Sequence, residues 1–148
     1  MKIFFALLGI LILLVFIHPS TEVYEAQISG SVVDIKGNPI SGAFVRRVSD
    51  KQTRNPGGSY TITKIYSEQT ITDRDGHYLL LEKKRQVWFH NPYKYLMPWI
   101  HCDAEMEVSV NGTKIFASGF KDKDLYFYNE KEWACKGAHF KKDFRVGG

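Results

Sequence analysis

Two blocks of this sequence have the same local pattern, and they restrict the fold more than any other feature of the chain. The first block runs from Ile28 to Val45, and the second from Thr70 to Leu80. In each block a β-prone run leads into a turn built from Gly, Asn, Asp or Pro, and a second β-prone run follows. This pattern is typical of strand-turn-strand corners and predicts an all-β domain.

The residues of these two blocks also resemble a known family. The shared positions read Gly30-x-Val32-x-Asp34-x-x-Gly37-x-Pro39-Ile40-x-Gly42-Ala43-x-Val45, followed by Thr70-x-Thr72-Asp73-x-Asp75-Gly76-x-Tyr78. Over about Ile28 to Leu81 the chain is thus similar to the carboxypeptidase regulatory-like domain. That resemblance implies a single prealbumin-like, Greek-key β-sandwich of about seven strands. From about Lys83 onward no family pattern is recognised.

The N-terminus indicates export. Lys2 precedes an uninterrupted apolar run from Ile3 to Ile17, and polar residues starting at His18 end it. A positive charge before a short apolar run is typical of a secretory signal. As a helix the run would span only about 22 Å, against about 30 Å for the hydrocarbon core of a bilayer, which is short for a permanent span.

No clear small-x-small cleavage site follows the apolar run, so two alternatives stay open for residues 1–20. They form either a cleaved signal peptide or an uncleaved signal-anchor helix, which would meet the membrane only through residues 3–17. We expect residues 21–27 to be a polar tether and residues 28–148 to be the β-sandwich domain. In both cases the domain is exported, either to the periplasm or to the outer face of the inner membrane.

Cysteine usage points to the same compartment. The chain has only Cys102 and Cys135, and an even count in an exported chain favours a disulfide between them. Two buried free thiols are the alternative. Neither cysteine has a second ligand at the spacing of a zinc site, and we expect neither a metal nor another cofactor.

Turn and strand signals divide the first half of the domain. We expect a strand near 26–34 and a bulge or strand end at 46–48, followed by a loop over 49–59, which is dense in Gly, Pro, Asn and Asp. Asp73 to Gly76 has too few carboxylates for a calcium site and is expected to be a plain turn. The basic triplet 83–85 is expected in a solvated loop.

The second half contains the clearest alternation. Between Glu105 and Val110, Met106 and Val108 are expected inward and Glu107 outward, and the Asn111-Gly112 pair that follows predicts a hairpin. Asn111 also begins an N-glycosylation sequon, which matters only in a eukaryotic source.

Aromatic residues concentrate between Gln86 and Cys102, where Pro92 and Pro98 exclude one continuous central strand. We expect Trp88 in the core and Trp99 nearer the surface. The candidate binding residues of this segment are Trp88, His90, Tyr93, Tyr95, Trp99 and His101.

Signatures of catalysis are missing from the sequence. No histidine is followed three residues later by Glu, and there is no Gly-x-Ser-x-Gly motif. The C-terminal residues 144–148 lack the Tyr and Ser of the transthyretin-like 5-hydroxyisourate hydrolases, an enzyme family of the same architecture. The formal charge of +4 is spread along the chain without a basic arm, which argues against nucleic-acid binding.

These observations favour an exported, non-catalytic binding module of the bacterial cell envelope. Its expected partner is another envelope protein, and neutralisation of an exported toxin is one form of such an interaction. The first alternative is carbohydrate binding through exposed aromatic residues. The second is an uncharacterised hydrolase of the transthyretin-like architecture.

Overall fold

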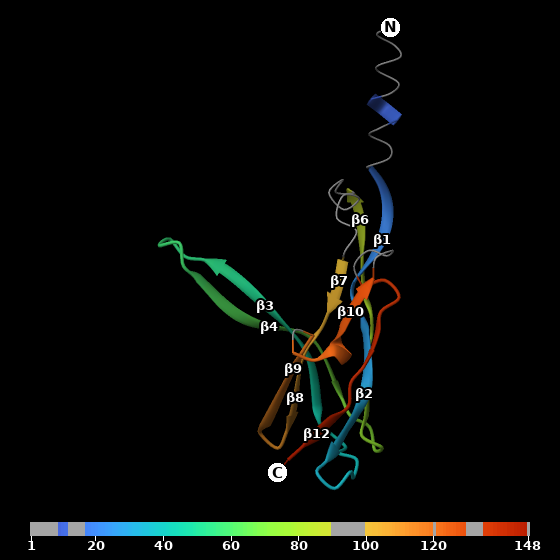
Figure 1. The fold of residues 1–148 in the computed structure, drawn as a ribbon, viewed down its shortest axis with the longest axis vertical. Coiled ribbons are helices and arrows are strands. Elements are labelled where there is room, and N and C mark those ends of the chain that lie inside the picture. Colours follow the sequence, from blue (N-terminus) through green and yellow to red (C-terminus); the bar gives the residue numbers. More distant parts are fainter. Residues whose placement is uncertain (1–8, 12–16, 90–99, 120, 130–134, 148) are drawn as a thin grey trace.

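The computed structural model describes residues 9–11, 17–89, 100–119, 121–129 and 135–147. This part of the chain is mostly β, which confirms the all-β prediction (Figure 1). The elements are β1 (Ile17–Glu25), β2 (Gln27–Asp34), β3 (Phe44–Arg54), β4 (Tyr60–Ile71), β5 (His77–Leu80), β6 (Lys83–Phe89), β7 (Ile100–Asp103), β8 (Glu105–Val110), β9 (Thr113–Ser118), a 3-10 helix η1 (Lys123–Leu125), β10 (Tyr126–Asn129), β11 (His139–Lys141) and β12 (Phe144–Val146). The expected count of about seven strands is wrong, because twelve strands occur among the described residues.

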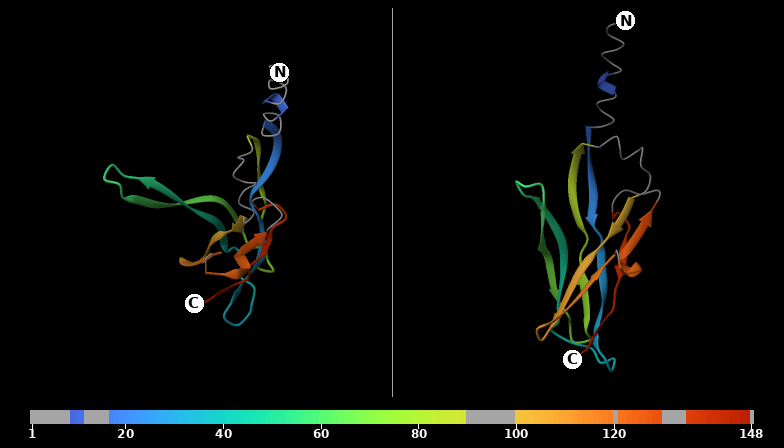
Figure 2. Two further views of the ribbon diagram at one scale, coloured as in Figure 1. Left: turned by 45° about the horizontal axis from the view of Figure 1, so that its top comes forward. Right: turned by 60° about the vertical axis from the view of Figure 1, so that its left-hand side comes forward.

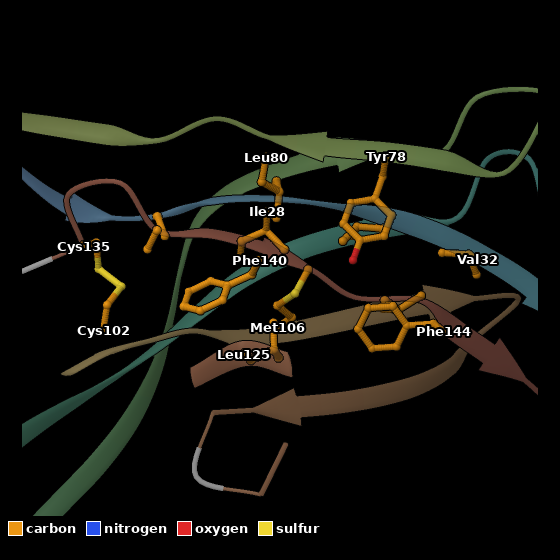
Figure 3. Close-up of a cluster of buried hydrophobic side chains, with 14 of the residues drawn as sticks. Ile28, Val32, Tyr78, Leu80, Cys102, Met106, Leu125, Cys135, Phe140 and Phe144 are labelled. Atoms are coloured by element: carbon orange, nitrogen blue, oxygen red, sulfur yellow. A yellow bond between two sulfur atoms is a disulfide. The ribbon is translucent and has the colours of Figure 1, made fainter. Parts of the chain in front are cut away.

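Two sheets form the body of a β-sandwich-like domain. One sheet has the order β4-β3-β8-β9, and in the other β2 pairs with β5, β11 and β12. Alternate side chains of the two sheets meet in one apolar core, where Ile28 and Phe140 from one sheet lie with Met106 from the other (Figure 3). Two further two-stranded ribbons, β1-β6 and β7-β10, account for strands beyond the expected count.

The N-terminal predictions need correction. Residues 21–27 are not a polar tether, because β1 starts at Ile17 and runs to Glu25, antiparallel to β6, and β2 starts at Gln27. Val23 and Ala26 are buried in the core, so hydrophobic burial and strand pairing hold this segment. Of the expected signal-anchor helix, residues 9–11 are helical, and the other residues before Ile17 lie outside the described part. The helices in the described residues are too short to span a membrane.

The hairpin of β3 and β4 replaces the loop expected over residues 49–59. Only residues 55–59 form the turn, while the strands pair in register from Arg54↔Tyr60 back to Val48↔Tyr66. A register shift lies between Arg47 and Val48, which confirms the predicted bulge. Beyond it the hairpin projects away from the sandwich (Figures 1 and 2), and we call residues 49–66 the arm.

The tight turns agree with their sequence signals. Asn111 and Gly112 both have positive φ (48° and 85°) and join β8 to β9, as the Asn-Gly pair predicts. At the other predicted turn, the Asp73 carboxylate accepts hydrogen bonds from the backbone N–H groups of Asp75 and His77. The basic triplet 83–85, in contrast, is not in a loop but lies within β6.

A close backbone approach explains the glycine in β2. A side chain at Gly30 would collide with the carbonyl group of Lys142, next to which β12 begins. The buried Tyr78 donates a hydrogen bond from its hydroxyl to that same carbonyl oxygen at 2.6 Å. Burial, and then the negative charge of Asp143, raise the pKa of Tyr78. Gly30 and Tyr78 together fasten the C-terminal strands to β2.

Candidate functional site

The aromatic segment provides only part of its predicted binding site. Trp88 lies on β6 and is 61% exposed, so its predicted place in the core is wrong. Among the described residues β6 pairs only with β1, and this ribbon extends beyond the sandwich (Figure 1). His101 is on β7 opposite Tyr128. The remaining candidates lie outside the described residues: His90, Tyr93, Tyr95 and Trp99.

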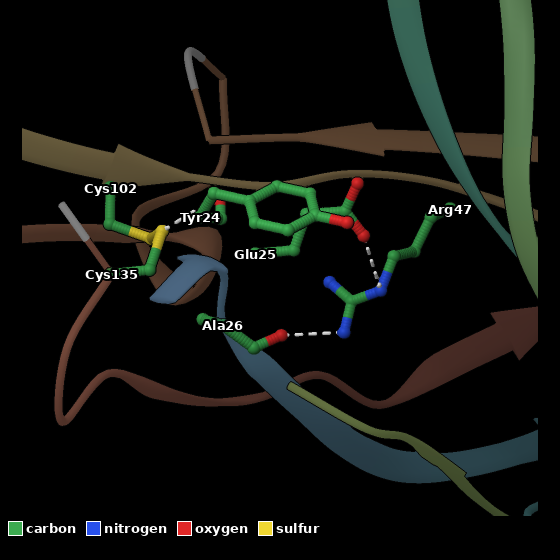
Figure 4. Close-up of a disulfide and its surroundings, with 6 residues drawn as sticks. All are labelled: Tyr24, Glu25, Ala26, Arg47, Cys102 and Cys135. Carbon is green, nitrogen blue, oxygen red and sulfur yellow. Dashed lines mark hydrogen bonds and ion pairs between the residues drawn. A yellow bond between two sulfur atoms is a disulfide. The ribbon is translucent and has the colours of Figure 1, made fainter. Parts of the chain in front are cut away.

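The predicted disulfide is confirmed. Cys102 and Cys135 are bonded, with their Cα atoms 5.0 Å apart, and both are buried (Figure 4). The backbone N–H of Cys135 donates to the Val23 carbonyl at 3.0 Å. The bond therefore ties β7 to the segment before β11 and holds both beside β1. Disulfides persist in oxidising compartments, so the bond agrees with an exported domain.

A buried arginine lies close to the disulfide. The Arg47 side chain is 5% exposed, and its Nε is 2.8 Å from Glu68 Oε2 and 3.3 Å from Glu25 Oε2. Its Nη2 donates to the carbonyl oxygens of Ala26 (2.5 Å) and Leu81 (2.8 Å). A buried guanidinium is stable only when its charge and donors are matched, and here both carboxylates and both carbonyls match them. Arg47 therefore joins β3 to β4 through Glu68, and to the end of β1 and the end of β5 through Glu25, Ala26 and Leu81.

Next to Arg47 is a pocket of about 370 Å³. Burial, and then repulsion from Asp50, raise the pKa of the Glu105 carboxyl group at its edge. The pocket is lined by Tyr24, Glu25, Arg47, Val48, Ser49, Asp50, Asp103, Ala104 and Glu105. Its lining has more carboxylates than cations, but the charge of Glu25 is already compensated by Arg47 and by Lys83, whose Nζ is 3.3 Å away.

A second charged group lies on the other face of the β4-β3-β8-β9 sheet. The Glu107 side chain is fully buried, although strand alternation directs it away from the core. Arg46 Nη2 is 2.6 Å from Glu107 Oε1, and the Tyr66 hydroxyl donates to Oε2 at 3.0 Å. This hydrogen bond is the main cause of the raised pKa of Tyr66. Glu107 thus holds an arginine and a tyrosine in fixed positions on this face.

Exposed apolar side chains surround this group. The strand register places Phe44 opposite Ile71, and Glu107 opposite Phe116. The Arg46 guanidinium lies 4.7 Å from the centre of the Tyr66 ring, and Lys64 Nζ lies 4.4 Å from that of Phe116. The four large apolar or aromatic members are each between 44% and 55% exposed. We call this set the outer aromatic face: Phe44, Arg46, Tyr66, Ile71, Glu107 and Phe116.

The opposite sheet carries a group of hydroxyl and ionisable side chains. Ser29 Oγ is 3.0 Å from His139 Nε2, and the Ser31 hydroxyl and N–H both donate to Asp143 Oδ1, at 2.7 and 2.8 Å. The Ser31 hydroxyl is the main cause of the lowered pKa of Asp143. These contacts connect β2 to the C-terminal strands. Within the described residues, no group of three or more His, Cys, Asp and Glu side chains could hold a metal ion.

The outer aromatic face was not predicted from the sequence. The alternation of β8 correctly directs Glu107 outward, but it says nothing of the side chains that cover Glu107. Arg46 and Tyr66 come from other strands, and the bulge after Arg47 sets the register between β3 and β4. A signal was present in the sequence, because Phe44, Tyr66 and Phe116 are large aromatic residues in β-prone runs, and large exposed apolar patches are uncommon on soluble proteins.

No protein-family profile and no curated protein sequence matches this chain. Among solved structures, the chain is similar to the dioxygenase domain of a dioxygenase and carbohydrate-binding protein fusion from the cellulolytic bacterium Streptomyces sp. SirexAA-E. The two are 14% identical, the match covers 86% of this chain and 82% of that chain, and the TM-score is 0.43.

The chain is also similar to a 3-chlorocatechol 1,2-dioxygenase from Rhodococcus opacus 1CP, with 13% identity and a TM-score of 0.38. That match covers 88% of this chain but only 60% of the dioxygenase chain. At these TM-scores neither likeness indicates a family or an activity. The function has to be argued from the residues of this chain.

Proposed function

We propose that this protein is an exported, non-catalytic binding module of the bacterial cell envelope, and that a partner protein docks on its outer aromatic face. The observation that carries the proposal is the exposure of four large apolar side chains around the fixed Arg46–Glu107 pair. Aromatic residues and arginine are enriched at protein interfaces and supply most of their binding energy.

The rigidity of the face supports this role. Arg46 is held by Glu107 and stacks on Tyr66, so less side-chain freedom is lost when a partner binds. The side chains of the face stand on a continuous sheet, which positions them more firmly than a loop would. Lys64 and Lys114 stand beside the face, so a partner with acidic residues around an apolar centre fits it best.

Export to the envelope rests on two features of the chain. Lys2 and the apolar run from Ile3 to Ile17 have the pattern of a secretory signal, and the Cys102–Cys135 disulfide suits an oxidising compartment. The resemblance of residues 28–81 to the carboxypeptidase regulatory-like domain, an accessory domain in carboxypeptidases, fits a binding role as well.

Site-specific photo-crosslinking tests the docking face. A benzophenone amino acid replaces Phe116 in cells that produce the protein, and in a matched variant it replaces Leu79, which is 46% exposed on the opposite sheet. We expect a crosslinked adduct with a different protein from position 116 only. Adding Phe44→Lys to the position 116 variant should weaken that adduct.

Three results would contradict the proposal: no adduct at position 116, the same adduct from both positions, or an adduct at twice the 17.0 kDa chain mass.

Carbohydrate binding remains a second candidate because Trp88 is 61% exposed, as a stacking residue would have to be. Its test is retention of the protein on immobilised envelope polysaccharide. Retention that Trp88→Ala abolishes and Phe116→Ala leaves unchanged would favour this candidate over protein docking.

A further inference from the structure

The two edges of the arm differ in how well they are protected against pairing with another strand. On the β3 edge, residues 49–54 include Asp50, Lys51 and Arg54, and charges of this kind commonly protect a strand edge. On the β4 edge, the stretch from Tyr60 to Tyr66 contains no proline and only one charge, Lys64. Within the described part of the chain, this stretch pairs with β3 alone. The β4 edge is therefore open and almost unprotected.

The unpaired part of the β4 edge ends where the strand reaches the sandwich. Beyond Tyr66, the carbonyl of Ser67 accepts a hydrogen bond from Lys83 Nζ at 3.1 Å. The Glu68 carboxylate pairs with Arg47 and accepts from the backbone N–H of Leu81. These contacts cover the edge next to the sandwich, so only Tyr60 to Tyr66 can accept another strand.

The arm also lacks the packing that usually stabilises a hairpin. A single two-stranded hairpin is marginally stable in water, whereas added strands or a packed layer stabilise it. Tyr60 and Ile62 are 61% and 59% exposed, and neither is among the residues of the apolar core. An additional strand on the β4 edge would satisfy its backbone groups and cover part of these side chains.

The sequence of this edge is complementary to itself. If two copies pair antiparallel about a two-fold axis at Thr63, Thr63 meets Thr63, Ile62 meets Lys64, Thr61 meets Ile65 and Tyr60 meets Tyr66. No two like charges are opposed, and the Tyr–Tyr and Thr–Thr pairs are of the kinds that stabilise antiparallel sheets. The only charge, Lys64, lies opposite Asp50 within its own hairpin, which reduces its repulsion from the second copy.

We infer that two copies of this chain associate through the β4 edges of their arms, with Thr63 at the two-fold axis. The interface is isologous, so it closes at a dimer, and the charged β3 edges remain outside. The two sheets join into one continuous sheet across the dimer. This inference goes beyond the proposed function, because it concerns backbone pairing along the edge of the arm. Only Tyr66 belongs to both the paired stretch and the outer aromatic face, and the other five residues of that face lie outside the paired stretch.

Cysteine crosslinking in the full-length chain tests the pairing. The described part of the chain has no free cysteine, and Cys102 and Cys135, its only two cysteines, are bonded, so Thr63→Cys adds one reactive thiol. Residues directly opposite in an antiparallel pair are close enough for a disulfide. Under mild oxidation we expect a band at twice 17.0 kDa, about tenfold stronger than with Thr53→Cys on the protected β3 edge.

Two charged substitutions at position 62 test the register of the proposed pairing. In the Thr63→Cys chain, Ile62→Lys places one lysine opposite Lys64 of the other copy, in each of the two symmetric pairs. Ile62→Glu places one carboxylate there instead. Both changes remove the same apolar side chain, and Ile62 faces the uncharged Gln52 within its own hairpin. We expect Ile62→Lys to reduce the crosslinked dimer about tenfold and Ile62→Glu to retain it.

Equal crosslinking of the cysteines at 63 and 53 would overturn the inference. So would equal loss of the dimer in the lysine and glutamate variants, or crosslinking of the cysteine at 63 only to another protein. The photo-crosslink from position 116 is on the outer aromatic face, so this inference and the proposed function can fail independently.

Discussion

The β3–β4 hairpin has two halves in very different environments. On the sandwich side of the bulge, Val45 is fully buried and Arg47 is buried among matched charges. Beyond the bulge, the same two strands continue as the arm, where Arg54, Tyr60 and Ile62 are exposed. Along β3 the residue types change from Phe-Val-Arg-Arg-Val over 44–48 to the polar residues of 49–54, whereas β4 carries Tyr60 and Ile62 in the arm. These two residues show that large apolar side chains on a strand stay exposed where no other layer of the described chain covers it.

Replacing one arginine in each half gives the largest expected contrast. Arg47→Ala removes the buried cation that pairs with Glu25 and Glu68 and the donor of two backbone carbonyls, and should lower the free energy of unfolding by about 3 kcal/mol. Arg54→Ala, at the exposed end of the same strand, should change it by less than about 0.5 kcal/mol. Urea unfolding of the two variants measures the difference. Equal effects would remove the distinction between the two halves.

Two substitutions of apolar residues, one in each half of the hairpin, test the same contrast without changing the charge. Val45→Ala removes buried methyl groups from the core and should cost about 2 kcal/mol, because Val45 is 0% exposed. Ile62→Ala removes more carbon atoms, but from a side chain 59% exposed, and should cost less than about 0.5 kcal/mol. Thermal melts at one protein concentration give both values. The prediction fails if the larger truncation has the larger effect.

Two tyrosines extend the comparison to pH. Tyr78→Phe removes the hydrogen bond to the Lys142 carbonyl and should cost about 1 kcal/mol near neutral pH, whereas Tyr60→Phe should have no effect. The pKa of Tyr78 is raised in the folded state, so its stabilising contribution is complete below the unfolded pKa of 10.0 and falls as the pH rises above it. Unfolding midpoints measured from pH 8 to 11 should therefore decline more steeply in the wild type than in Tyr78→Phe.

The smallest expected effect is that of removing the arm. Replacing residues 50–64 by an Asn-Gly turn should change the free energy of unfolding of the sandwich by less than about 0.5 kcal/mol, since these residues add nothing to the core. In the intact protein, amide hydrogens of residues 49–54 should exchange faster than those of 44–48 at a concentration that keeps the chain monomeric. Uniform protection along β3 would mean that the arm is part of the folded body.

Local chemistry let several features be predicted from the sequence. The Asn111-Gly112 hairpin, the turn at Asp73 to Gly76, the bulge near Arg47 and the inward positions of Met106 and Val108 are all confirmed. Each depends on a backbone conformation or on strand alternation within a few residues. The disulfide was predictable from an even cysteine count in a chain whose N-terminal sequence predicts export.

Other features could not be predicted because residues far apart in the sequence determine them. The turn-forming residues 55–58 correctly indicate a turn. How far the strands continue on each side of it depends on whether the two strands form backbone hydrogen bonds with each other. Trp88 is exposed on β6, which among the described residues pairs only with β1, and this arrangement cannot be predicted from the residues near Trp88. Residues 21–25 of the expected tether form a strand because they pair with β6, a segment about sixty residues away, and Gln27 pairs with β11.

The sequence by itself therefore determined the β class, the tight turns and the disulfide, since local conformation and cysteine count suffice for these. Only the tertiary structure decided which strands lie in layers, and so which side chains are buried. Glu107 shows the physical reason most clearly. Strand alternation correctly directs it away from the core, yet its side chain is completely buried, and Arg46 from β3 and Tyr66 from β4 bind its carboxylate. Whether a side chain is buried depends on the side chains of the neighbouring strands. Pairing between segments far apart in the sequence determines which strands are neighbours.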